Sequence, residues 1–337
     1  MGYLLDGVWH EDAPANDARG RFVRQATRFH NWVTPNGSPG LTGDGGFKSE
    51  AGRYHLYISL ACPWAHRTLI FRALKQLEDV ISLSVVDAIM GADGWVFSDA
   101  PGATRDIAEG TSRLAEIYLR ANPTYTGRVT VPVLWDKRKK TIVNNESSEI
   151  IRMFNSAFDA FTPVRTDYYP KELRGQIDEI NKVVYENVNN GVYRAGFAAT
   201  QEAYEEAFRN LFETLDKLED TLSRQRYLVG STITEADWRL FTTLVRFDAV
   251  YHGHFKCNLR RIDDYPNLSN YLRDLYQVPG VPGTVNMDHI KRHYYGSHRK
   301  LNPSGIVPLG PELHFDAPHD RARFDAVLRT KARASLA

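Results

Sequence analysis

The residue with the clearest capacity for chemistry is Cys62, which lies in residues 60–66 with the sequence LACPWAH. A β-favouring run precedes it and a helical pattern follows it, so the thiol is expected at a strand-to-helix junction. Pro63 suits the first turn of that helix, where its missing N–H costs no hydrogen bond. Free amides and the positive end of the helix dipole would then favour the thiolate, which is the nucleophile. The alternative is that Cys62 is a small buried apolar residue.

Position 65, three residues after Cys62, is alanine, so the Cys-x-x-Cys pattern is missing from the sequence. No neighbouring thiol can therefore resolve a disulfide that forms at Cys62. The pattern predicts a monothiol whose mixed disulfide is released by a second, soluble thiol. Cys257, the other cysteine, falls in a helical region far along the chain and is expected to serve packing.

The elements that must position this thiol follow one another in the order βαβ–ββα over residues 54–155. The helix after Cys62 is predicted from apolar residues that recur at every fourth position between residues 64 and 77. The strands are expected in residues 55–59, 81–85, 131–135 and 141–144. The first two strands flank the helix and should be parallel, whereas the last two should form a hairpin. This order predicts an α/β domain with the thioredoxin-like arrangement.

Four segments are predicted along the whole chain. Residues 1–50 are rich in Gly, Asn, Asp and Pro and are expected to form an extended arm with turns. Residues 51–160 contain the α/β pattern, and residues 165–310 have helical apolar periods throughout, which predict an all-α domain. Residues 311–337 form a tail.

Two stretches depart from these regular patterns. Residues 87–128 are expected to be a long irregular insertion, and such insertions in compact domains are usually functional or disordered. Residues 320–331, in the tail, are expected to form a short helix with Phe324, Val327 and Leu328 on one face.

Composition narrows the possible functions. The 337 residues carry a formal net charge of +1, which gives no basis for binding nucleic acid or an anionic membrane surface. No apolar run approaches the roughly 20 residues needed to span a bilayer. Two cysteines cannot form a disulfide framework and suit a reducing compartment, and no spacing of Cys, His and carboxylates resembles a zinc site. We therefore expect a cytoplasmic protein with no metal, no nucleic-acid partner and no membrane association.

Two further features are expected to face Cys62. Val131 and Pro132 open a strand, where an internal proline would break the ladder. In thioredoxin-like proteins a proline here is cis and faces the active thiol; the alternative is a trans proline on an edge strand. Glu146 and Ser147 stand at a helix start, whose amides could hold an anion while Glu146 accepts an ammonium group. Plain helix capping would use the same two residues.

Several motifs together resemble those of a glutathione transferase. They are CPWAHR at 62–67, VPVLWD at 131–136, NNESSEI at 144–150 and a capping box at 234–237. More narrowly, the chain is similar to the xi class, the glutathionyl-hydroquinone reductases. The match runs over most of the chain and includes residues 22–24, Gly94 with Trp95, and HYYGSH at 293–298. The specific segments are CPWA at 62–65 and HYYGSH. The resemblance implies a thioredoxin-like domain followed by an all-α domain, and a homodimer.

The resemblance also implies roles for individual residues, with Cys62 as the nucleophile and glutathione as the co-substrate. Glutathione would be held by Trp95, Arg128, Val129, Val131, Glu146 and Ser147. Among these, Trp95 would pack on it, Arg128 would act by charge, and Glu146 with Ser147 would take the γ-glutamyl end. The pocket for a glutathionylated aromatic small molecule would be lined by Tyr193, Tyr251, Tyr294 and Tyr295, with Tyr193 and Tyr294 as candidate catalytic residues. His66 and Arg67, one turn along the helix, are expected to have structural roles.

The resulting hypothesis is the glutathione-dependent reduction of glutathionyl-hydroquinones through a mixed disulfide at Cys62. An omega-like thioltransferase or dehydroascorbate reductase would use the same cysteine–proline start, without needing the tyrosine cluster or the 87–128 insertion. A non-catalytic binding module on the same fold is a third possibility. That third hypothesis predicts slow alkylation of Cys62 at about pH 6, because an ordinary thiol has a pKa of about 8.5.

Overall fold

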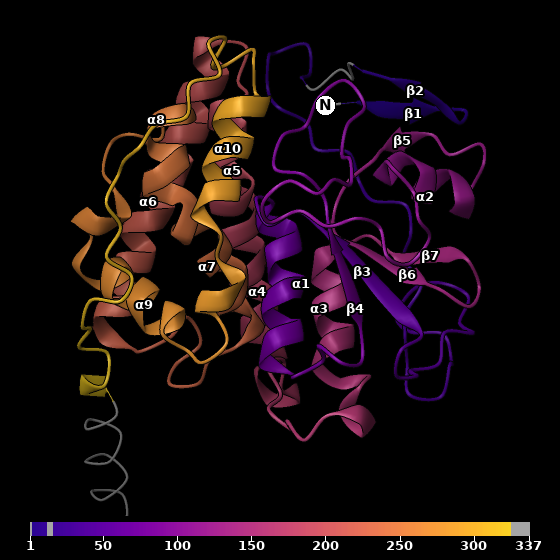
Figure 1. Cartoon of the computed structure of the whole chain (residues 1–337). Coiled ribbons are helices and arrows are strands. Elements are labelled where there is room, and N and C mark those ends of the chain that lie inside the picture. Colours follow the sequence, from indigo (N-terminus) through magenta and orange to yellow (C-terminus); the bar gives the residue numbers. More distant parts are fainter. Residues whose placement is uncertain (1, 12–15, 325–337) are drawn as a thin grey trace, which may run out of the picture. The chain divides into compact units, whose positions relative to one another are not determined.

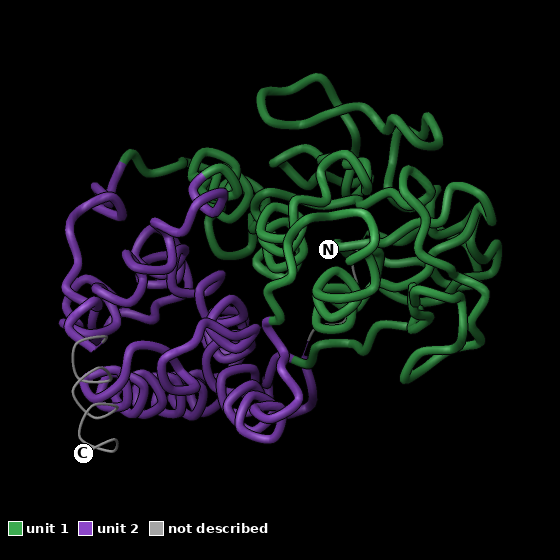
Figure 2. Tube along the Cα trace, turned by 90° about the horizontal axis from the view of Figure 1, so that it is seen from below, with its two compact units in different colours: residues 1–15, 23–167, 283–309 green, residues 16–22, 168–282, 310–337 purple. Residues whose placement is uncertain are grey.

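The computed structural model describes residues 2–11 and 16–324 (Figure 1), and it divides into two compact units (Figure 2). Unit 1 comprises residues 1–15, 23–167 and 283–309, and unit 2 comprises residues 16–22, 168–282 and 310–337. Each unit is therefore assembled from separate stretches of the chain. No helix in the described residues is long and apolar enough to cross a membrane.

The centre of unit 1 is a four-stranded sheet with the strand order β4–β3–β6–β7. β3 (Tyr54–Ile58) and β4 (Ser82–Val85) are parallel, whereas β6 (Val133–Asp136) is antiparallel to both β3 and β7 (Thr141–Asn144). Every residue of β3 and β6 is buried, as expected for central strands. Two helices of this unit, α1 (Pro63–Leu74) and α3 (Ser147–Ser156), pack against each other. The predicted thioredoxin-like order is confirmed.

The 87–128 stretch is more regular than the sequence suggested. It contains α2 (Leu114–Ala121) and β5 (Gly127–Arg128). The prediction of an irregular insertion was wrong for α2 because this helix is short and begins after Arg113, which is not a typical capping residue. Glu116 supplies the cap from inside the helix, since its Oε1 accepts a hydrogen bond from the Arg113 amide at 3.1 Å.

The first residues of the chain form a hairpin of two short strands, β1 (Tyr3–Leu5) and β2 (Val8–His10). β1 also pairs with β5 in an antiparallel sense, which gives a second sheet with the order β2–β1–β5. Further along the arm, the Asn31 amide donates to the Val143 carbonyl at 3.0 Å, and the Asn145 amide donates to the Phe29 carbonyl at 3.2 Å. The arm therefore covers the edge of the central sheet at β7.

Unit 1 also contains α10 (Met287–Ser297), which the sequence-based division placed with the helical segment 165–310. Hydrogen bonds from α10 to other segments of unit 1 explain why this helix groups with unit 1. His289 Nε2 lies 2.7 Å from the Pro101 carbonyl oxygen, and His293 Nδ1 lies 3.0 Å from the Ala88 carbonyl oxygen. Just before the helix, Thr284 Oγ1 lies 2.8 Å from His66 Nε2 in α1. Such long-range bonds cannot be read from helical periodicity.

Unit 2 is helical in its described residues, which confirms the predicted all-α domain. Its α-helices are α4 (Arg174–Val184), α5 (Gly191–Gly196), α6 (Gln201–Arg224), α7 (Glu235–Arg246), α8 (His252–His254) and α9 (Pro266–Tyr276). Two π-helical segments, η3 (Tyr185–Asn189) and η4 (Phe247–Tyr251), continue α4 and α7. The short 3-10 segments within residues 2–11 and 16–324 are η1 (Asp159–Phe161), η2 (Lys171–Leu173), η5 (Ile262–Asp264) and η6 (Pro282–Thr284).

The predicted capping box at the start of α7 is present. Asp237 Oδ2 accepts hydrogen bonds from the Thr234 amide at 2.8 Å and from its hydroxyl at 3.1 Å. The other oxygen accepts from the Leu228 amide and from the Tyr271 hydroxyl of α9. This buried carboxylate therefore joins a helix start to a second helix. The short helix predicted for residues 320–331 falls largely on residues 325–337, which lie outside the described residues.

Candidate active site

Cys62 is the N-cap of α1, with extended backbone angles, and Pro63 is the first helical residue. The thiol is half-buried, and its Sγ lies 3.6 Å from the carbonyl oxygen of Val131. The Val131–Pro132 peptide bond is cis, as predicted. The first amides of an α-helix have no acceptors within the helix, and together they carry a partial positive charge. Cys62 thus stands where a thiolate is favoured.

Trp64, two residues after Cys62, makes cation–π contacts with two guanidinium groups. The Arg24 guanidinium carbon is 4.7 Å from the ring centroid, and that of Arg67 is 4.6 Å from it. Arg24 comes from the arm, whereas Arg67 comes from the next turn of α1 and reaches Ser147 Oγ at 3.4 Å. Cation–π contacts hold both charges close to the start of α1. Two positive charges therefore lie beside Trp64, two residues after the thiol.

Arg128 lies in β5, where its backbone pairs with Tyr3 of β1. Burial lowers the pKa of Arg128, and the positive charge of Arg24 lowers it further. Two neighbouring cations of this kind repel each other, and an anionic group between them would relieve the repulsion. Val129, the next residue, is buried. The structure therefore places Arg24 of the arm close enough to Arg128 for the two charges to interact. The sequence had given Arg24 no role of its own.

Trp95 is buried, and one face of its ring stacks on His293 of α10, with the centroids 4.8 Å apart. Its segment is braced from the arm, because Trp9 Nε1 donates to the Ala92 carbonyl at 2.8 Å. The ring of Trp9 also lies directly against Gly94, where a Cβ atom would approach it to 2.6 Å. Glycine at position 94 is thus required by close approach as well as by its positive φ of 71°.

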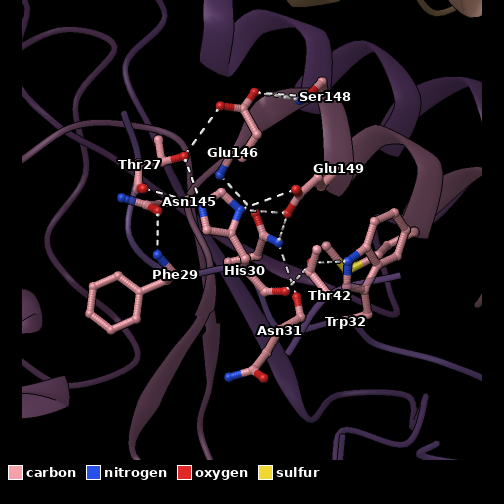
Figure 3. Close-up of polar contacts among 12 residues, drawn as sticks. Thr27, Phe29, His30, Asn31, Trp32, Thr42, Asn145, Glu146, Ser148 and Glu149 are labelled. Atoms are coloured by element: carbon pink, nitrogen blue, oxygen red, sulfur yellow. Dashed lines mark hydrogen bonds and ion pairs between the residues drawn. The ribbon is translucent and has the colours of Figure 1, made fainter. Parts of the chain in front are cut away.

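Glu146 is the N-cap of α3, and Ser147 is its first residue. Glu146 Oε1 accepts hydrogen bonds from the amide and the hydroxyl of Ser148, each at 3.0 Å (Figure 3). Glu146 Oε2 accepts from the Thr27 hydroxyl at 3.4 Å. Helix capping, the plain alternative for this residue, is therefore present. The carboxylate is only half-buried, which also leaves it accessible to a cationic group.

The four tyrosines expected around the acceptor are divided between the two units. Tyr193 and Tyr251 belong to unit 2, where their ring centroids are 6.1 Å apart and both rings contact Phe255. Tyr294 and Tyr295 are neighbours on α10 in unit 1. The Tyr294 ring is buried and lies edge-on to His298, whereas Tyr295 is half-buried.

Comparison with known proteins places these features in a family. Residues 61–157 match the family described as glutathione S-transferase, N-terminal domain, and residues 201–274 match glutathione S-transferase, C-terminal domain. The glutathionyl-hydroquinone reductase YqjG of Escherichia coli is 57% identical over 323 residues, which cover 95% of this chain and 98% of the relative. The glutathionyl-hydroquinone reductase PcpF of Sphingobium chlorophenolicum is 57% identical over 312 residues, covering 92% and 96%.

Solved structures agree with the sequence relatives. The glutathione-bound structure of YqjG superimposes with a TM-score of 0.89 at 56% identity, covering 95% of this chain and 99% of that one. A xi class transferase from Natrialba magadii also gives a TM-score of 0.89, at 52% identity, covering 96% and 97%. The chain belongs to the xi class of glutathione transferases, the family of the glutathionyl-hydroquinone reductases.

Three arm residues of this xi-class chain that lie near the candidate site carry no recognisable motif in the sequence. They are Arg24, Thr27 and His30, which reach the starts of α1 and α3. Their approach depends on the pairing of the arm with β7, and that pairing carries no strong local signal. The aromatic residues Phe29 and Trp32 in an otherwise polar stretch were the available hint that this part of the arm packs on the domain.

Proposed function

We propose that this protein reduces glutathionyl-hydroquinones to hydroquinones at the expense of glutathione. The observation that carries the proposal is Cys62 at the start of α1, with Sγ 3.6 Å from the Val131 carbonyl, in a chain 57% identical to two glutathionyl-hydroquinone reductases. Glutathione and glutathionylated aromatic compounds are thus its small-molecule partners. We further propose a cytoplasmic homodimer that needs no metal.

In the first half-reaction, the Cys62 thiolate attacks the sulfur that joins glutathione to the hydroquinone ring. A sulfur–sulfur bond forms and the carbon–sulfur bond breaks, and its electron pair stays on the ring carbon. That carbon takes a proton from an acid, and the hydroquinone leaves. Tyr193 or Tyr294 supplies this proton, with Tyr251 and Tyr295 lining the rest of the acceptor pocket.

In the second half-reaction, a second glutathione thiolate attacks the mixed disulfide on Cys62. Oxidised glutathione leaves and the Cys62 thiolate is restored. The aromatic ring has then gained two electrons and a proton, and two glutathione moieties have joined in one disulfide. Because position 65 is alanine, no protein thiol competes with the second glutathione. The kinetics should therefore be ping-pong.

The glutathione moiety is held by residues of unit 1 on either side of Cys62. Glu146 accepts the γ-glutamyl ammonium group, and Ser147 lies at the helix start that receives the γ-glutamyl carboxylate. The Val131 backbone pairs with the cysteinyl residue. Arg128, with Arg24 beside it, attracts the glycyl carboxylate by charge. Trp95 and Val129 provide packing surface.

The test is mass spectrometry of the protein after incubation with one equivalent of a glutathionyl-hydroquinone. We expect one glutathione adduct on Cys62 and an equal amount of released hydroquinone. Cys257→Ala serves as the matched control and should behave like the native protein, because Cys257 is fully buried and burial raises the pKa of its thiol. In Cys62→Ala, both the adduct and the turnover should be lost. Undiminished hydroquinone release by Cys62→Ala would exclude the mechanism.

Two comparisons separate the alternatives. Dehydroascorbate in place of the glutathionyl-hydroquinone tests an omega-like activity, and a higher kcat/KM for dehydroascorbate would favour that assignment. Alkylation of Cys62 by iodoacetamide at about pH 6 tests a purely binding role. Rapid labelling at that pH is expected of a thiolate and would argue against a non-catalytic module.

A further inference from the structure

The arm brings two residues, Thr27 and His30, against the start of α3 (Figure 3). Backbone bonds to Val143 and Asn145, at the end of β7, hold this part of the arm, and the Phe29 amide also donates to Asn145 Oδ1 at 3.1 Å. Thr42, further along the arm, donates its hydroxyl hydrogen to the His30 carbonyl at 2.6 Å. The backbone around His30 is therefore fixed from several directions, and the direction of its ring is set by the fold.

Both nitrogens of the His30 ring face hydrogen-bond acceptors. Nδ1 lies 3.0 and 3.1 Å from the two carboxylate oxygens of Glu149, and Nε2 lies 3.1 Å from the Thr27 carbonyl oxygen. A carboxylate and a carbonyl cannot donate, so a ring with hydrogen on both nitrogens satisfies these contacts best. The geometry thus favours the imidazolium form, whose Nδ1–H bonds to Glu149 of α3 and whose Nε2–H bonds to Thr27 within the arm.

The Thr27 hydroxyl connects this ring to Glu146. Its oxygen lies 3.3 Å from His30 Nε2 and 3.4 Å from Glu146 Oε2. A hydroxyl can accept one hydrogen bond and donate another, so it can accept from the imidazolium and donate to the carboxylate. The second oxygen of Glu146 is held by Ser148 at 3.0 Å. The Glu146 carboxylate is therefore fixed from the helix on one side and from the arm on the other.

Two carboxylates, those of Glu146 and Glu149, act on the His30 ring. Burial opposes the protonation of His30, but the hydrogen bond to Glu149, the Thr27 carbonyl and the charges of Glu149 and Glu146 outweigh it and raise its pKa. Glu149 is also bonded by the neutral amide of Asn144 from β7, at 2.6 Å. His30 thus offsets one of two carboxylates. Among these three side chains, one negative charge therefore remains, on Glu146.

We propose that Thr27 and His30 are positioning residues that orient the Glu146 carboxylate toward the ammonium group of the γ-glutamyl moiety. The inference rests on the proposed function of Glu146. An ammonium group gains most from a carboxylate whose direction is already fixed, because no orientation is then lost on binding. The arm therefore contributes to the selectivity of the enzyme for a γ-glutamyl thiol.

The experiment compares two ligands that differ by one group. S-Methylglutathione cannot form a disulfide, and its S-methyl glutaryl-cysteinylglycine analogue lacks only the ammonium group. Dissociation constants for both are measured by titration calorimetry. Their ratio reports the ammonium contribution and is insensitive to a general change in the fold.

Thr27→Val removes the hydroxyl with little change in shape. We expect it to weaken S-methylglutathione binding by about tenfold and to leave the glutaryl analogue within about twofold, consistent with the loss of a hydrogen bond to a charged group. Thr27→Ser keeps the hydroxyl and should restore the native ratio. Thr34→Val makes the same change elsewhere in the arm, where the Thr34 hydroxyl donates to the Ser38 carbonyl, and should leave the ratio unaltered.

His30→Gln should reduce the ratio by a smaller factor, about threefold, because an amide can replace only part of the imidazolium's contacts. The double variant Thr27→Val/His30→Gln should be no worse than Thr27→Val alone, because both act through one carboxylate. In steady-state assays of Thr27→Val, KM for glutathione should rise while kcat stays unchanged.

The outcomes distinguish the role of Glu146 in binding the ammonium group from the role of the arm in orienting Glu146. If the native protein binds both ligands equally, the role of Glu146 in the proposed function is wrong. If the native protein prefers S-methylglutathione but Thr27→Val keeps the full preference, only the role of the arm is wrong. Equal weakening of both ligands in Thr27→Val would also overturn the inference, since it would indicate a general structural effect.

Discussion

At the scale of single residues, the way in which a disulfide at Cys62 is resolved depends on the residue at position 65, which is alanine. Ala65 is fully buried in the first turn of α1, so this turn of the helix supplies no second sulfur. A mixed disulfide formed at Cys62 is then reduced by a thiol from solution. The identity of one small residue thus sets the stoichiometry of the proposed reaction.

Ala65→Cys should change that stoichiometry. A thiol at this position can attack the Cys62–glutathione disulfide, because the Cys-x-x-Cys spacing at a helix start allows a disulfide. We expect one turnover with glutathionyl-hydroquinone to leave an intramolecular disulfide and release glutathione, as measured by intact mass and thiol titration. Ala65→Ser, similar in size but without a thiol, should keep the glutathione adduct. A stable adduct in Ala65→Cys would contradict the prediction.

The His30–Glu149 pair predicts a dependence of stability on pH. The pKa of His30 is raised above its ordinary value of 6.5, chiefly by the Glu149 hydrogen bond acting against burial. The pair therefore contributes fully below about pH 6.5 and loses its contribution as the pH rises through the raised pKa. Because the His30 side chain is 36% exposed, the contribution should stay below about 1 kcal/mol.

The measurement is the free energy of unfolding in urea for the native protein and for His30→Gln at about pH 6 and about pH 9. The difference between the two proteins should be larger at the lower pH. A difference that grew with pH would show that His30 is neutral in the folded state.

At the scale of elements, the start of α7 illustrates how a helix cap can carry tertiary structure. Asp237 accepts hydrogen bonds from two backbone amides and two hydroxyl groups, and it is fully buried. Removing the carboxylate leaves all four donors without this acceptor. The cost should therefore exceed that of an ordinary helix cap.

Asp237→Ala should lower the free energy of unfolding by about 3 kcal/mol, measured by urea denaturation. Asp220→Ala provides the matched control, because Asp220 forms an exposed ion pair with Arg224 one turn further along α6. That change should cost less than about 0.5 kcal/mol. Equal losses of unfolding free energy in the two variants would mean that the buried hydrogen bonds of Asp237 do not contribute to stability.

Elements with local signals were predictable from the sequence. The β3–α1–β4 unit and the β6–β7 hairpin have regular apolar periods, and the capping box has a fixed spacing. α2 was missed because its cap is atypical, and the pairing of β1 with β5 joins residues more than a hundred positions apart. At the site, Cys62 and cis Pro132 could be predicted from motifs, whereas Thr27 and His30 could not, because tertiary pairing alone brings them to α3.

At the scale of the whole molecule, the units are not continuous in sequence. Residues 16–22 belong to unit 2, whereas the arm on either side of them belongs to unit 1. Phe22 lies against Tyr193 and Phe197, with centroids 6.4 and 5.4 Å away, and Asn16 Nδ2 donates to the Phe197 carbonyl at 2.7 Å. The arm therefore completes the aromatic cluster that contains one of the proposed acceptor tyrosines.

Phe22→Ala should destabilise the protein by about 3 kcal/mol, since it opens a cavity beside Tyr193. Thermal unfolding measured by circular dichroism provides the test. Phe161→Ala, at a side chain that is 39% exposed, should have a much smaller effect. If Phe22→Ala left the melting temperature unchanged, the segment 16–22 would not be part of the folded core of unit 2.

The long sequence separation between the arm and its partners has a consequence for synthesis in the cell. A ribosome releases residues 29–31 long before it makes Val143 and Asn145, which pair with them, and residue 16 long before it makes Phe197. Residues 29–31 can therefore pair with β7 only after that strand has been made, and residue 16 can reach its partner only after Phe197 has been made. The arm's low hydrophobicity and its many Gly, Asn and Pro residues suit a segment that spends that interval in water.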